Sequence, residues 1–119
     1  MRESMEKKIK ITFVLPEQLQ HELRQKVVGD GYGMRGKSKW VGEAIESLIE
    51  HTDFISLGYL SNEMKGFEKM ETISIGKNIK NKIDNAILET RKKYPMLEGV
   101  QSRLIRTSIM QRILRNISK

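Results

Sequence analysis

The sequence predicts a mainly α-helical domain made of two strand–helix–helix repeats, whose two strands pair antiparallel over four helices. Segments with alternating apolar residues are each followed by segments with helical apolar spacing, and this order of segments occurs twice. The chain has 119 residues, which is the size of a single domain. An isolated pair of strands is only marginally stable in water, so helices must cover one of its faces.

The first repeat is predicted over residues 7–50. Within residues 8–15 the odd positions are apolar and most even positions are polar, which is typical of a half-buried strand. Pro16 ends this strand, because proline lacks the backbone N–H of a strand ladder and fits the first turn of a helix. A helix with apolar residues four apart then starts near Glu17, and a glycine-rich turn over residues 29–36 ends it.

The second helix of this repeat is predicted to begin at Ser38, because serine is a favoured N-cap residue. An apolar stripe follows, which runs from Trp40 to Ile49 at helical spacing. A stripe of this kind indicates a helix that faces the core. We therefore interpret Trp40 as a core residue rather than as a residue that stacks on a base.

The second repeat is predicted over residues 70–117, and it matches the first position by position. Residues 72–75 alternate like residues 12–15 at an offset of 60, and the following helix keeps this offset. After a longer loop between the helices the offset becomes 64, which places Ser102 at the position of Ser38. A strand and two helices cannot bury their own apolar face, so the two repeats are expected to share one core.

Residues 51–69 are predicted to be an apolar connector between the repeats. They include large apolar side chains such as Phe54, Leu57 and Phe67, which are unusual in a free tether. The sequence leaves open whether the connector packs on the shared core or forms a contact with another protein molecule.

This pattern resembles the ribbon–helix–helix DNA-binding family, which includes the Arc and MetJ repressors. The resemblance rests on residues 10–17 and 36–41 and on their counterparts, residues 72–75 and 101–105. Two repeats in one chain look like the tandem members among plasmid-transfer accessory proteins. The resemblance implies a tandem ribbon–helix–helix pseudo-dimer that inserts its ribbon in the major groove of double-stranded DNA.

The resemblance also implies two sets of DNA-binding residues. Base reading is assigned to outward strand side chains, namely Lys10, Thr12, Val14, Met70, Thr72 and Ser74. Phosphate binding is assigned to the start of each second helix, namely Lys37, Ser38, Lys39, Gln101, Ser102 and Arg103. Free amides and the helix dipole at a helix start favour an anion. Because the two strands carry different outward residues, we expect an asymmetric rather than a palindromic DNA site.

The charge balance agrees with an anionic partner. Lys and Arg total 22 against 15 Asp and Glu, which gives a net charge of +7, and the excess lies in residues 61–119. The expected partners are double-stranded DNA, further copies of the chain on adjacent sites, and a relaxase or another transfer protein. No apolar run is long enough to span a membrane, so a cytoplasmic location without a membrane partner is expected. The biological role is left open between transcriptional repressor and relaxosome accessory factor in plasmid conjugation.

An enzyme, a cofactor and a metal centre are not expected. The chain has no cysteine, and its two histidines, His21 and His51, lack a set of partner ligands in the sequence. Residues 31–38 match the phosphate-loop pattern GxxxxGK[ST], but the preceding segment has helical spacing where that motif needs a buried strand. The alternative function is a basic helical protein-interaction module or a non-specific DNA-architectural module.

Four arginines follow one another along the predicted last helix: Arg103, Arg106, Arg112 and Arg115. The sequence leaves open whether they form a solvated face, contact the DNA backbone or meet an acidic partner protein. Arg112 aligns with Leu48, a position that the first repeat indicates to be buried.

Overall fold

The computed structural model describes residues 8–33, 35–50 and 68–117. Its elements are β1 (Ile9–Pro16), α1 (Glu17–Gly29), α2 (Lys37–Ile49), β2 (Glu68–Ile75), α4 (Lys77–Lys93) and α5 (Val100–Ile117). Within the described ranges the order strand–helix–helix therefore occurs twice. The prediction of a mainly α-helical fold with one two-stranded antiparallel sheet is confirmed.

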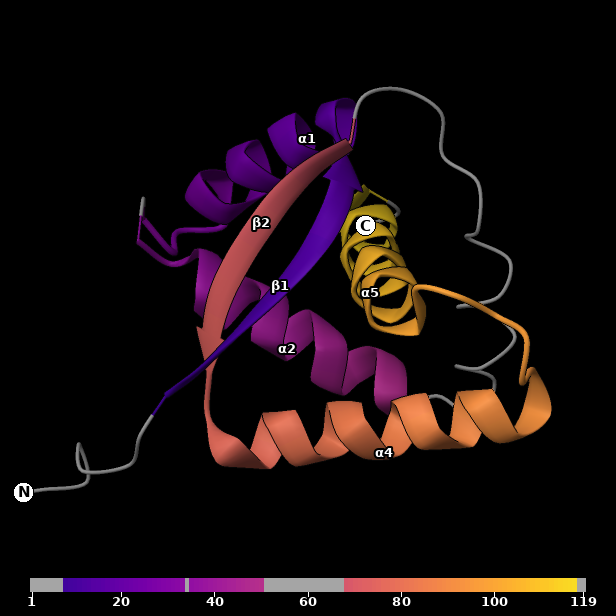
Figure 1. The fold of residues 1–119 in the computed structure, drawn as a ribbon. Coiled ribbons are helices and arrows are strands. Elements are labelled where there is room, and N and C mark those ends of the chain that lie inside the picture. Colours follow the sequence, from indigo (N-terminus) through magenta and orange to yellow (C-terminus); the bar gives the residue numbers. More distant parts are fainter. Residues whose placement is uncertain (1–7, 34, 51–67, 118–119) are drawn as a thin grey trace, which may run out of the picture.

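The two strands cross one side of the molecule as a ribbon, and the four described helices lie behind it (Figure 1). α2 and α5 pack against each other, while α1 and α4 lie on opposite sides of the ribbon. α2 contacts β2 and α5 contacts β1, so each of these helices packs on the strand of the other repeat.

The register of the ribbon relates the two repeats by a local two-fold axis. β1 and β2 pair antiparallel with Thr12 opposite Thr72. These two threonines also occupy the same position in the two repeats, at the offset of 60. The two-fold axis therefore passes through the Thr12–Thr72 pair, and it relates the pair of Lys10 with Ser74 to the pair of Met70 with Val14.

The inward side chains of the ribbon form one core with all four described helices. The buried apolar strand residues are Ile11, Phe13, Leu15, Ile73 and Ile75. Trp40 is fully buried among them, as the sequence predicts. Each buried side chain of this size stabilises the fold by about 1.5–3 kcal/mol relative to its exposed state.

The boundary between the connector and the second strand differs from the sequence prediction. Glu68 and Lys69, expected in the connector, are the first residues of β2, where they pair with Pro16 and Leu15. The apolar alternation is absent from this end of β2, so the pattern did not indicate a strand there. Most of the predicted connector, residues 51–67, lies outside the described residues.

The predicted serine N-caps are also wrong. α2 begins at Lys37 with Gly36 as its N-cap residue, and no side chain caps it. Ser38 therefore lies inside the first turn. Ser102 likewise lies inside α5, which begins at Val100. Both hydroxyl groups bind the ribbon instead.

Candidate nucleic-acid interface

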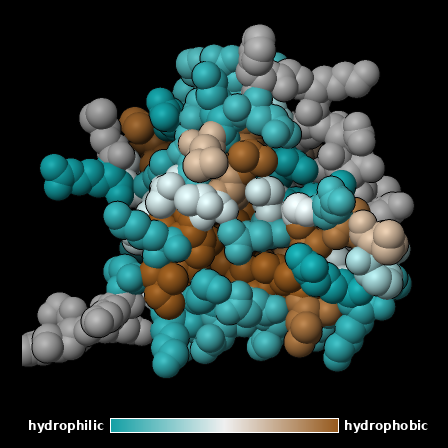
Figure 2. All heavy atoms as spheres, viewed as in Figure 1, coloured by the Kyte–Doolittle hydropathy of each residue, from teal (hydrophilic) through white to brown (hydrophobic). Residues whose placement is uncertain are grey.

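The outer face of the ribbon carries all six side chains that the sequence assigns to base reading: Lys10, Thr12, Val14, Met70, Thr72 and Ser74. Four of them are exposed, and Val14 and Ser74 are half-buried. In the same view as Figure 1, pale residues of intermediate hydropathy lie over the middle of the ribbon (Figure 2). Lys10 is the one charged side chain among these six, and the other five are uncharged polar or apolar residues.

Both serines in the first turns of α2 and α5 tie these helices to the ribbon. The backbone N–H of Ser74 donates to Ser38 Oγ at 2.9 Å, and the backbone N–H of Val14 donates to Ser102 Oγ at 3.2 Å. Both strands of a two-stranded ribbon are edges, so half of their N–H groups have no strand partner. The serines supply that partner from the other repeat, which holds the two helix starts beside the ribbon.

The other residues predicted to bind phosphate differ in what they contact. Lys39 is exposed at the start of α2. Gln101 Nε2 donates to the carbonyl oxygen of Thr12 at 2.7 Å, and Arg103 Nε donates to the carbonyl oxygen of Glu98 at 2.9 Å. Each of the two helices therefore carries one further basic side chain in its first turn, Lys39 in α2 and Arg103 in α5.

Lys37 is held by a buried carboxylate. Glu71 takes the inward position that Ile11 has in the first strand, and its side chain is only 4% exposed. Lys37 Nζ lies 2.5 Å from this carboxylate, and Gln20 also donates to it. Arg24 Nη2 lies 3.7 Å away. The charge of Lys37 is therefore compensated within the protein.

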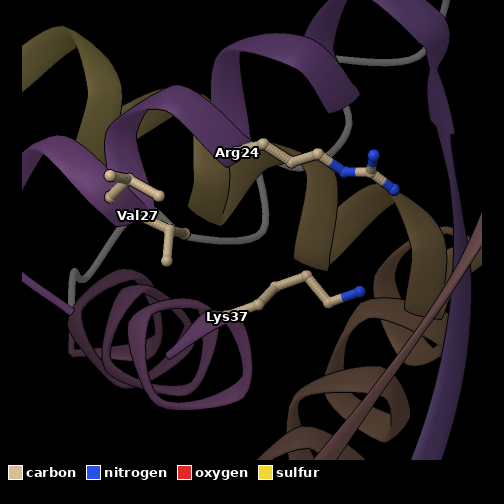
Figure 3. Close-up of a pocket in the computed structure, with 4 residues that line it drawn as sticks. Arg24, Val27 and Lys37 are labelled. Atoms are coloured by element: carbon tan, nitrogen blue, oxygen red, sulfur yellow. The ribbon is translucent and has the colours of Figure 1, made fainter. Parts of the chain in front are cut away.

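The surroundings of Glu71 lower its pKa. Burial alone would raise this pKa, but hydrogen bonds from Lys37 and Gln20 and the charges of Lys37 and Arg24 lower it further than burial raises it. Arg24 and Lys37 extend from α1 and from the start of α2 along a pocket of about 310 Å³ that Val27 also lines (Figure 3). The two basic side chains that line this pocket are therefore the ion-pair partners of Glu71.

Acid is expected to destabilise the protein through Glu71. Because the pKa of Glu71 is lowered on folding, its charge stabilises the fold above the ordinary value of about 4.3, and this contribution is lost as the pH falls through the lowered value. Glu71→Gln should lower the free energy of unfolding by about 1–2 kcal/mol at pH 7 and by much less near pH 2. Urea unfolding at both pH values measures this. Glu89→Gln, at an exposed site on α4, is the control, and an equal loss at both pH values for Glu71→Gln would contradict the assignment.

The arginines of α5 do not form one solvated face. The Arg112 guanidinium lies over the Trp40 ring, 4.5 Å from its centroid, and donates to the Trp40 carbonyl oxygen and to Tyr32 Oη, at 2.8 Å each. Arg106 is 5% exposed, and burial together with the charge of Arg103 lowers its pKa. The possibility of a solvated face is therefore wrong for Arg106 and Arg112.

Two further features of the sequence are the phosphate-loop-like segment and the two histidines. The phosphate-loop-like segment follows α1 where the nucleotide-binding motif would need a strand, and Gly31 and Gly33 in it have positive φ angles. His21 is exposed on α1, and His51 lies outside the described residues. The described ranges contain no group of three or more His, Asp or Glu side chains placed to hold a metal ion.

Among the described helices, none has the length and apolar character needed to cross a membrane.

Comparison with protein-family models, with curated proteins and with solved structures finds no match for this chain. The geometry itself defines a class of protein. It is a basic, mainly helical domain with an exposed two-stranded ribbon, and a helix start is hydrogen-bonded to each strand.

Proposed function

We propose that the chain is a tandem ribbon–helix–helix protein that binds double-stranded DNA sequence-specifically, with its ribbon in the major groove. The pairing of Thr12 with Thr72 at the centre of an exposed ribbon carries this proposal. A two-stranded ribbon fits the major groove, where each base pair presents a distinct pattern of donors, acceptors and methyl groups. Threonine offers both a hydroxyl group and a methyl group to such a pattern.

The positions of the helix starts support the same function. The first N–H groups of a helix have no partner within it, and with the helix dipole they favour an anion. The bonds to Ser38 and Ser102 hold two such starts beside the two strands. Lys39 and Arg103 add a positive charge to each start, so phosphates on both sides of the groove would find a binding group.

Two biological roles fit this mode of binding. A repressor needs only to occupy a promoter site, and a relaxosome accessory factor needs to occupy a plasmid origin of transfer and assist a relaxase there. Both roles belong to a cytoplasmic protein that acts without a catalytic step of its own. The position of the bound site in the DNA separates the two.

Selection of bound duplexes from a random pool near physiological salt tests the proposal. An enriched motif is expected, because direct reading of bases distinguishes sites by several kcal/mol. Binding without enrichment would contradict sequence-specific reading and would favour a non-specific architectural module. No binding at all would favour a protein-interaction module.

Thr12→Ala and Thr72→Ala are each expected to weaken binding to the selected site by about 1–3 kcal/mol and to change binding to random DNA little. The reason is that base contacts carry the sequence preference, whereas phosphate contacts do not. Fluorescence anisotropy with both duplexes measures the two affinities. Lys39→Ala is the matched control, since it should weaken both complexes alike and reduce their salt dependence. Equal losses on both duplexes for the threonine variants would contradict base reading.

A further inference from the structure

The three outward pairs at the centre of the ribbon, from Lys10–Ser74 through Thr12–Thr72 to Val14–Met70, change in chemical character along its length. Lys10 lies opposite Ser74 at one end, and Val14 lies opposite Met70 at the other. Each strand by itself carries a mixture of polar and apolar outward residues. Antiparallel pairing in this register sorts them, so both hydrogen-bonding side chains fall at one end and both apolar side chains at the other.

At each end of this outward face a long side chain lies opposite a shorter one and extends further from the ribbon. Lys10 is exposed beside the half-buried Ser74, and Met70 is 71% exposed beside the half-buried Val14. A side chain of 71% exposure that is apolar and unbranched is available for contact with a partner. Directly opposed residues lie about 4.5–5.5 Å apart at Cβ, so each pair reaches the same or adjacent base pairs.

The two ends suit different base pairs. The lysine ammonium group has three donors and no acceptor, which matches the guanine O6 and N7 acceptors, and a serine hydroxyl group adapts to either partner. Methionine and valine offer only apolar surface, which matches the C5-methyl group of thymine. A G·C pair against the apolar end would lose water from its polar edge without gaining a hydrogen bond, which is unfavourable.

We infer, on the basis of the proposed DNA binding, that the target site has two chemically different halves on either side of a centre at Thr12 and Thr72. In one half Lys10 and Ser74 read a G·C pair through its hydrogen-bonding edge. In the other half Val14 and Met70 contact the methyl groups of thymines in A·T pairs.

Two variants with identical outward residues on both strands test this inference. Met70→Lys with Ser74→Val gives both strands the order Lys-Thr-Val, and Lys10→Met with Val14→Ser gives both strands the order Met-Thr-Ser. In the random-pool selection the unmodified protein should enrich a motif with one G·C half and one A·T half. Each variant should enrich a palindrome, because its two ribbon ends are then equivalent. Circular dichroism melting checks that both variants keep the fold.

Modified bases test the contacts in the unmodified protein. Replacing thymine by uracil in the A·T half removes the methyl group and should weaken binding about fourfold for each contacted methyl. Replacing guanine by 7-deazaguanine in the other half removes the N7 acceptor and should also weaken binding. Met70→Ala should reduce only the sensitivity to uracil, because Val14 remains at that end, and Lys10→Ala should reduce only the sensitivity to 7-deazaguanine, because Ser74 remains at the other.

The outcomes separate this inference from the function on which it rests. An enriched motif whose halves do not differ, or folded variants that enrich no palindrome, would overturn the polarised site and leave DNA reading intact. A random-pool selection without any enriched motif would overturn the proposed function itself.

Discussion

Ile73→Asp is expected to unfold the protein. Ile73 is 1% exposed and lies opposite Ile11 in the ribbon, where both side chains point into the shared core. A carboxylate in this place would have no partner, and burial of an unpaired charge destabilises a protein by more than about 4 kcal/mol. That loss is a large part of the 5–15 kcal/mol by which native domains are typically stable. Circular dichroism at 25 °C and on heating should show the loss of helix.

The neighbouring position gives a matched control. Thr72 lies one residue away on the outer face, so Thr72→Asp should stay folded, with a melting temperature within a few degrees of that of the unmodified protein. If the proposed DNA binding is correct, this variant should lose affinity for duplexes, because its new charge faces the phosphate-rich groove. A stable Ile73→Asp protein would show that the inward and outward faces of β2 are assigned wrongly.

Trp40→Ala is expected to lower the free energy of unfolding by about 3–5 kcal/mol. The Trp40 ring is fully buried, and its Nε1 donates to Asp30 at 2.8 Å. The Arg112 guanidinium stacks on the ring, so the substitution leaves a cavity and also removes the surface on which this cation rests. Urea unfolding followed by circular dichroism measures the loss.

A double-mutant cycle isolates the contact between these two side chains. Arg112→Ala alone should cost less than Trp40→Ala, because Glu43, the carboxylate that pairs with Arg112, is partly exposed and can be hydrated. The double variant should cost clearly less than the sum of the two single losses, since each substitution already removes the stacking contact. Additive losses would show that Arg112 stabilises the fold independently of Trp40.

The sequence predicted the faces of the ribbon because alternation is a local property of a strand. In residues 8–15 the period of two assigns Thr12 to the solvent and Phe13 to the core, as the structure confirms. The repeat offset predicted that two equivalent strands pair antiparallel. It did not predict the register, because an offset alone does not say at which residue the two-fold axis lies.

The features that the sequence did not predict depend on contacts between the repeats. Serine is a good N-cap by local propensity, but Ser38 and Ser102 serve strand N–H groups of the other repeat, which no local pattern reveals. Glu71 and Arg112 take positions where the other repeat has Ile11 and Leu48, and a polar residue at an apolar position was the available signal. Their partners lie on other elements, so the sequence could not identify them.

The exchange of contacts between the repeats has a consequence for synthesis on the ribosome. β1 has its pairing partner in β2 and its packing partner in α5, both of which leave the ribosome after the first fifty residues. Until then, of the described elements, only α1 can cover the apolar side chains of β1 and α2, and the rest of their shared core is missing. Long-range pairing of this kind delays folding until the distant segment is available. We therefore expect the nascent first repeat to remain unfolded and to need protection from aggregation until α5 has emerged.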